Sequence, residues 1–104
     1  MTINIPGQGR VIAYYGPDAQ AMVHMEECAE LAQAVSKMRR ARNSGGDDTA
    51  AYYNLVEEMA DVLVCLEQMR EMYGIYSHEI QAVVDKKCRR QEARMHDACG
   101  RICP

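Results

Sequence analysis

Two short segments of the chain repeat one arrangement of acidic residues. The segment HMEECAEL (24–31) holds two adjacent glutamates and a third glutamate three positions after the second. The segment VEEMADVL (56–63) has the same order, with an aspartate in the last place. Carboxylates bind hard cations and transfer protons. Residues three apart share one face of a helix, so each segment would present two carboxylates side by side.

A helical projection at about 100° per residue gives the direction of these carboxylates. Glu27 and Glu30 fall in one arc with the apolar side chains Val23, Leu31, Ala34 and Met38. Glu58 and Asp61 fall on or beside an apolar stripe made of Leu55, Met59, Val62, Leu66, Met69 and Tyr73. The remaining member of each pair, Glu26 or Glu57, falls on the polar side. The projection therefore predicts four carboxylates that face the interior.

Four interior carboxylates would repel one another unless a positive group lies between them. One isolated pair of acids on a helix most often lies on a solvated face and pairs with lysine. Two inward-facing pairs on two helices instead favour a hard cation, Mg²⁺ or alternatively Mn²⁺. A ferritin-like di-iron site requires Glu-x-x-His on two helices. The residues three positions before His24, His78 and His96 are Ala21, Ile75 and Ala93, which argues against that design.

Basic residues recur near the C-terminus at helical spacing. Lys87, Arg90 and Arg94 fall on or beside a face marked by Ile80, Val83, Val84 and Gln91, whereas Lys86 and Arg89 point away. Cations that face a metal-binding acidic cluster are what a polyphosphate requires. The alternative is that these side chains pair directly with the four acids or extend into solvent.

Helix signals in the sequence would position these groups on three long helices. Gly16-Pro17-Asp18 predicts a helix start, and nothing breaks a helix from there to about residue 42. The segment NSGGDDT predicts a loop in which Asp48 or Thr49 caps a second helix, expected over about 50–73. Gly74 would end that helix, and Ser77 would cap a third that runs to about residue 97.

The predicted fold is all-α, an antiparallel bundle of three long helices in a single domain over residues 1–104. Residues 17–97 form the helical core, and 98–104 form a frayed tail. Residues 1–16 form a short irregular arm, in which Val11–Tyr15 could be a short strand or extended. A chain of 104 residues has a small core, and amphipathic helices of this length are normally completed by a second copy. We therefore expect a homodimer or a dimer of dimers.

Composition restricts the partners. The net charge of −3 argues against a general nucleic-acid binder. The first residues do not contain a basic segment followed by an apolar run, and no run of about 18 apolar residues occurs, so we expect a cytoplasmic protein that does not bind a membrane. The five cysteines are an odd number, and those within predicted helices are expected to be reduced. His96, Cys99 and Cys103 have metal-like spacing but lack a fourth ligand.

Three motifs in this order resemble the MazG-like all-α nucleoside triphosphate pyrophosphohydrolases. They are EECAE (26–30), EEMAD (57–61) and KCRRQEARM (87–95), and the resemblance covers about residues 17–96. The resemblance implies hydrolysis of a nucleoside triphosphate between its α- and β-phosphates, which yields a monophosphate and pyrophosphate. Related branches include dimeric dUTPases and phosphoribosyl-ATP pyrophosphohydrolases, and a short domain of this kind suggests nucleotide-pool cleaning by analogy.

The same resemblance assigns roles to residues of this chain. Glu27, Glu30, Glu58 and Asp61 would bind Mg²⁺ and form the catalytic site, with one of them available as general base. Lys87, Arg90 and Arg94 would contact phosphate. Lys37 and Gln20 are further candidates for the nucleotide, although both are more typical of ordinary surface residues. Because the chain has no Trp or Phe, base stacking would fall to tyrosines, Tyr14, Tyr15, Tyr52 or Tyr53.

Two functions of other classes remain open at this stage. The chain could be a helical interaction module that uses its apolar faces only for oligomerisation. It could also be a metal or nucleotide sensor that binds without turnover.

Overall fold

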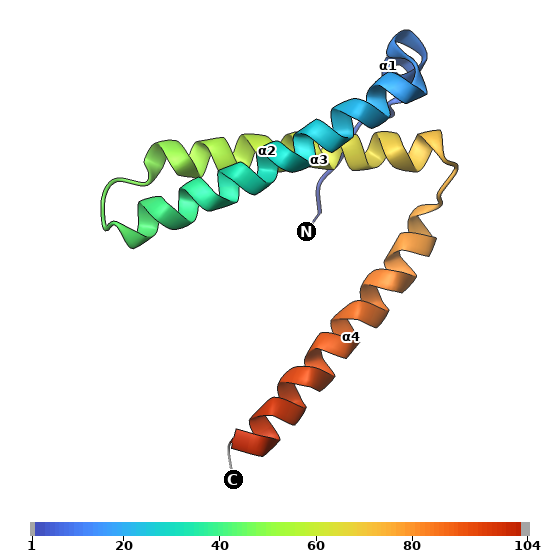
Figure 1. Ribbon diagram of the computed structural model, residues 1–104. Coiled ribbons are helices and arrows are strands. Elements are labelled where there is room, and N and C mark those ends of the chain that lie inside the picture. Colours follow the sequence, from blue (N-terminus) through green and yellow to red (C-terminus); the bar gives the residue numbers. More distant parts are fainter. Residues whose placement is uncertain (1, 103–104) are drawn as a thin grey trace. The chain divides into compact units, whose positions relative to one another are not determined.

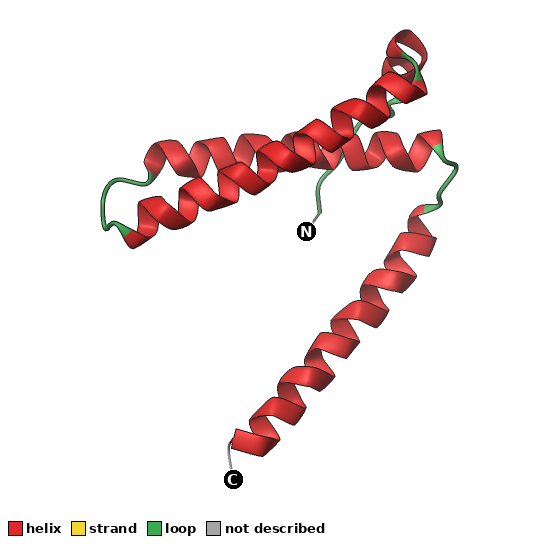
Figure 2. Ribbon diagram, viewed as in Figure 1, coloured by secondary structure: helices red, strands yellow, loops and turns green. Residues whose placement is uncertain are grey.

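The computed structural model describes residues 2–102 and the side chains of residues 2–99. Every regular element among them is a helix (Figures 1 and 2). The four helices are α1 (Gly9–Tyr15), α2 (Pro17–Asn43), α3 (Thr49–Met72) and α4 (Ser77–Ile102). The all-α prediction is confirmed, and none of the described helices is long and apolar enough to cross a membrane.

Local signals explain where α2 begins and ends. Gly16 has a φ of 91°, and Pro17 and Asp18 occupy the first turn of α2. A left-handed backbone at Gly16 separates α2 from α1, since a residue with a Cβ would be strained there. Proline suits the first helical position, and an acid is favourable near the positive end of the helix dipole. Gly45, with a φ of 71°, follows the C-terminus of α2.

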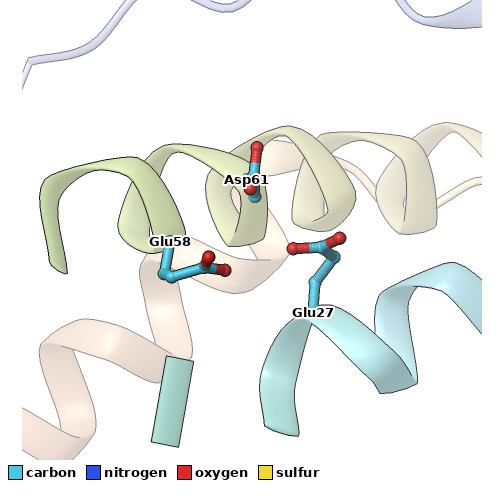
Figure 3. Close-up of side chains that lie close together, drawn as sticks. All are labelled: Glu27, Glu58 and Asp61. Atoms are coloured by element: carbon cyan, nitrogen blue, oxygen red, sulfur yellow. The ribbon is translucent and has the colours of Figure 1, made fainter. Parts of the chain in front are cut away.

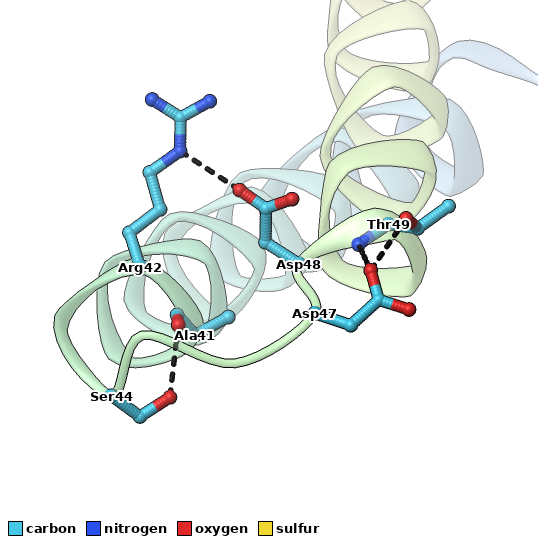
Figure 4. A network of polar contacts seen from close by, with 6 residues as sticks. All are labelled: Ala41, Arg42, Ser44, Asp47, Asp48 and Thr49. Carbon is cyan, nitrogen blue, oxygen red and sulfur yellow. Dashed lines mark hydrogen bonds and ion pairs between the residues drawn. The ribbon is translucent and has the colours of Figure 1, made fainter.

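The loop between α2 and α3 is held by a small polar network (Figure 4). The Asp47 carboxylate accepts hydrogen bonds from the Thr49 backbone N–H at 3.0 Å and from the Thr49 hydroxyl at 2.6 Å. Asp48 instead accepts a hydrogen bond from Arg42 at 3.1 Å. Asp48 thus occupies the N-cap position of α3, as one of the two predicted residues, but its side chain makes no capping hydrogen bond, and the carboxylate that binds the Thr49 N–H is that of Asp47.

Helices α2 and α3 pack side by side in an antiparallel pair, and α1 contacts both (Figure 1). These three helices belong to one compact unit, Met1–Tyr73, and α4 belongs to a second unit, Gly74–Pro104. The core of the described residues is thin, because its buried apolar side chains are Ala34 and Cys65. Packing of three long helices into one bundle, and its completion by a second copy, stay predictions.

The N-terminal arm differs from its prediction, because residues 9–15 are helical rather than irregular or extended. The β-branched pair Val11-Ile12 favours a strand by local propensity. Contacts with α2 and α3 override that preference. The Gln8 carbonyl accepts a hydrogen bond from the Ile12 N–H at 3.0 Å, and the Ile12 carbonyl accepts one from the Gly16 N–H at 2.8 Å.

The second unit is a long amphipathic helix. Its first turn is closed by the Glu79 carboxylate, which accepts a hydrogen bond from the Tyr76 backbone N–H at 2.8 Å. This is half of a capping box, with Tyr76 rather than the predicted Ser77 at the cap position. The helix continues to Ile102, so residues 98–102 of the expected frayed tail are helical. Cys103 lies outside the described residues.

Candidate metal centre

Three of the four predicted acids come together at the α2/α3 interface. One carboxylate oxygen from each of Glu27, Glu58 and Asp61 lies within 4.8 Å of the other two. Glu27 extends from α2 toward α3, and the Glu58 side chain is turned toward it (Figure 3). The antiparallel packing explains the meeting, because the acidic segments lie midway along both helices and pass each other there.

The cluster leaves carboxylate oxygens without partners. Glu27 and Glu58 are half-buried, and the Oε2 atom of each is buried with no hydrogen-bond donor within the described part of the chain. The ion pairs of the described residues, Arg42–Asp48 and Arg70–Glu67, both lie outside the cluster. Buried polar atoms are nearly always satisfied, so orphaned carboxylate oxygens call for a cation or ordered water.

The electrostatics of the cluster agree with its geometry. Burial, with added repulsion from Glu30, Asp61 and Glu58, raises the pKa of Glu27 from 4.5 to about 7. Burial is also the main cause that raises the pKa of Glu58, followed by the charges of Glu30 and Asp61. Both effects disfavour the ionised carboxylate in the absence of a cation.

This donor set fits a hard divalent cation. Carboxylate oxygens are the preferred ligands of Mg²⁺ and Mn²⁺, and a cation among them would satisfy the orphaned atoms and remove the repulsion. Glu30, the fourth predicted acid, is exposed rather than interior as the projection predicted. It nevertheless lies close enough to raise the pKa of both Glu27 and Glu58. The acid pairs also divide as the projection predicted, because Glu26 and Glu57 are exposed whereas Glu27 and Glu58 are not.

The predicted basic residues are all exposed, unlike the three acids of the cluster. Lys37 is exposed on α2, two helical turns after Glu30. Lys87, Arg90 and Arg94 are exposed on α4, in the second unit. Lys87 lines a groove with Ile80, Val83 and Val84, which agrees with the helical face assigned from the sequence. Contact between these cations and a phosphate stays a prediction.

A chain of buried glutamines at the same interface was not foreseen. Gln20 of α2 donates a hydrogen bond to Gln68 of α3 at 3.0 Å, and Gln68 donates to Gln8 at 3.0 Å. The interpretation of Gln20 as a surface residue is wrong, since it is buried. The available signal was spacing, because Gln20 lies seven residues before Glu27 and Gln68 seven residues after Asp61.

Fold and site together define an all-helical protein with a carboxylate cluster suited to a divalent cation. The sequence model of the MazG nucleotide pyrophosphohydrolase domain matches residues 16–95. The matched range includes all of α2 and α3 and most of α4. The chain belongs to the MazG family of nucleotide pyrophosphohydrolases. No curated protein and no solved structure gave a significant match.

Proposed function

We propose that this protein hydrolyses a nucleoside triphosphate between its α- and β-phosphates in a Mg²⁺-dependent reaction. One water molecule is consumed, and the products are a nucleoside monophosphate and pyrophosphate. The observation that carries the proposal is the cluster of Glu27, Glu58 and Asp61, whose orphaned oxygens suit a cation. Membership in a family of nucleotide pyrophosphohydrolases supplies the substrate class.

Each predicted residue has a role in this proposal. Glu27, Glu30, Glu58 and Asp61 hold the cation, and one of them accepts a proton from the attacking water. Bound Mg²⁺ would neutralise phosphate charge and lower the pKa of water. Lys87, Arg90, Arg94 and Lys37 contact phosphate oxygens, which basic side chains bind through charge-assisted hydrogen bonds. The biological role that best suits a short domain of this kind is removal of unwanted nucleotides from the cytoplasmic pool.

An assembly of identical copies is part of the proposal. Several large apolar side chains of α3 are about half exposed, among them Val56 at 48%, Met59 at 45% and Leu66 at 50%. Apolar surface in such amounts on a small helical unit supports association. A homodimer or a dimer of dimers would cover it, and sedimentation of the purified chain measures which of the two forms.

The direct test is pyrophosphate release from a panel of canonical and modified nucleoside triphosphates, with Mg²⁺ or with EDTA. The variant is Glu58→Gln, and the matched control is Glu57→Gln, which removes an exposed carboxylate next to it. We expect metal-dependent release by the wild type and the control but at least a hundredfold less by Glu58→Gln.

Two other outcomes would identify the alternatives. Mg²⁺ binding without pyrophosphate release from any nucleotide would indicate a sensor. An absence of any Mg²⁺ effect on binding or melting would leave a helical oligomerisation module.

A further inference from the structure

The buried glutamines form a directed chain across three segments. Gln20 Nε2 donates to Gln68 Oε1, Gln68 Nε2 donates to Gln8 Oε1, and Gln8 Nε2 donates to the Pro6 carbonyl at 2.9 Å. The exposed fractions of Gln8, Gln20 and Gln68 are 8%, 7% and 4%. Each side chain is therefore more than nine-tenths buried, and its amide depends on its protein partners.

The chain is tied to the arm as well as to the helix pair. Gln8 precedes the first residue of α1, and its backbone N–H donates to the Glu71 carboxylate of α3 at 2.7 Å. The position of α1 is thereby fixed relative to the C-terminal half of α3. One polar network joins α2, α3 and the arm at a single level of the helix pair.

The spacing relates this network to the acidic cluster. Gln20, Glu27 and Ala34 follow one another at seven-residue intervals on α2, and Asp61 and Gln68 have the same interval on α3. Seven residues are about two helical turns, or about 10.5 Å. Gln20 meets Gln68 and Glu27 meets Asp61, so the two contacts share one antiparallel register. Any axial shift that breaks the first contact also separates the second.

Other contacts specify this register weakly. Among the described residues the buried apolar side chains are Ala34 and Cys65, and both are small, so no large buried side chain interlocks the two helices. The carboxylates of the cluster oppose their own alignment until a cation binds. A one-turn slide would leave buried amides without hydrogen-bond partners, which is strongly unfavourable. Single buried polar contacts are known to set the register of paired helices in this way.

We infer that Gln20 and Gln68 are positioning residues, which fix the axial register of α2 against α3 and hold Glu27 opposite Asp61 before the cation arrives. The inference rests on the proposed function, because it assigns the cluster to a cation. The affinity of the carboxylate cluster for the cation would then depend on two neutral side chains, Gln20 and Gln68, that do not contact the cation. Preorganisation of this kind lowers the reorganisation needed on binding.

The test is calorimetric titration with Mn²⁺ of the wild type and of the double variant Gln20→Leu/Gln68→Leu. Replacing both partners with apolar groups of similar size leaves no unsatisfied amide on α2 or α3. The Gln8 Oε1 acceptor alone loses its donor, so melting in EDTA should fall only slightly. We expect the dissociation constant for Mn²⁺ to rise about tenfold, the low end of the effects of groups that orient metal ligands. The matched control is Gln33→Leu, which replaces an exposed glutamine nearer to Glu30 and should bind as the wild type does.

A second measurement reports the register without any metal. Nuclear Overhauser contacts of the fully buried Ala34 methyl group with α3 should be altered in the double variant and unchanged in the control. An unchanged set of contacts together with wild-type Mn²⁺ affinity would overturn the inference. If the wild type itself bound no Mn²⁺, the proposed function would fail, and the methyl contacts alone would decide the register. If the double variant did not fold, Gln20→Leu alone would be judged by the same two measurements.

Discussion

Removal of one carboxylate from the cluster should stabilise the metal-free protein and abolish its response to Mg²⁺. The suitable change is Glu27→Gln, since the pKa of Glu27 is raised from 4.5 to about 7. For a carboxyl group fully buried from solvent, this pKa difference corresponds to a destabilisation of the ionised form by about 3 kcal/mol. Because the Glu27 side chain is only half-buried, solvent screening reduces the value to about 1–2 kcal/mol. For a chain of this size, such a gain raises the melting temperature by about 5–10 °C.

The stability of the metal-free protein should fall as the pH rises. A carboxyl group with a raised folded-state pKa contributes stability that is fully present below its unfolded value, here 4.5. That stability is lost as the pH rises through about 7. In EDTA the wild type should therefore melt at a higher temperature at pH 5.5 than at pH 8. The melting temperature of Glu27→Gln should not show this decrease with pH, and at pH 8 it should be higher than that of the wild type.

Thermal unfolding followed by circular dichroism at both pH values, in EDTA and in Mg²⁺, measures the effect. Glu26→Gln is the matched control, because Glu26 is the exposed neighbour of Glu27 and its removal changes the net charge equally. If both variants shifted the melting temperature in EDTA by the same amount, net charge would explain the result. The reasoning about a repulsive cluster would then be refuted.

Two further predictions concern the parts of the fold that surround the cluster. Asp47→Ala should lower the melting temperature by a few degrees, because it removes both hydrogen bonds to Thr49 at the start of α3. Arg42→Ala should have little effect, since the ion pair of Arg42 with Asp48 is exposed. Melting curves of the two variants provide the comparison, and equal shifts would contradict it. Gln8→Ala should speed amide hydrogen exchange in α1, because the hydrogen bonds of Gln8 connect α1 to the pair of α2 and α3. Exchange in the middle of α2 and α3 should stay slow. Uniformly faster exchange would show instead that the glutamine chain supports the whole unit.

The paired acids were predictable from the sequence because a charge within an apolar arc is an anomaly that periodicity exposes. The projection separated Glu27 from Glu26 and Glu58 from Glu57, and the exposure of these side chains follows the same division, whereas Glu30, also predicted to face the interior, is exposed. Apart from the C-terminal end of α4, the bounds of the long helices were predicted to within about one residue for a related reason. Gly16-Pro17 and Gly74 are backbone signals that act locally and do not depend on the partner helix.

The glutamine chain was not predictable by the same means. A neutral amide is equally compatible with a solvated face and with a buried contact, so Gln20 gave no anomaly in the projection. Its burial depends on Gln68 and Gln8, which lie far along the chain and meet it only after the helices pair. The helix at 9–15 was missed for the same reason, because contacts with α2 and α3 override the local propensity of Val11 and Ile12.

Because the core is thin, a bound cation would contribute to stability as well as to the proposed chemistry. At a free concentration 100 times its dissociation constant, a ligand that binds only the folded state stabilises it by about 2.7 kcal/mol. That exceeds the destabilisation of about 1–2 kcal/mol that the burial of the Glu27 carboxylate and its repulsion by the other acids cause at pH 8, so binding should more than offset it. The order of melting temperatures of the wild type and Glu27→Gln should therefore reverse when Mg²⁺ replaces EDTA. If Glu27 instead formed a structural ion pair or lay on an ordinary solvated face, the order of melting temperatures would not reverse, because the charge of Glu27 would then not be coupled to a metal cation.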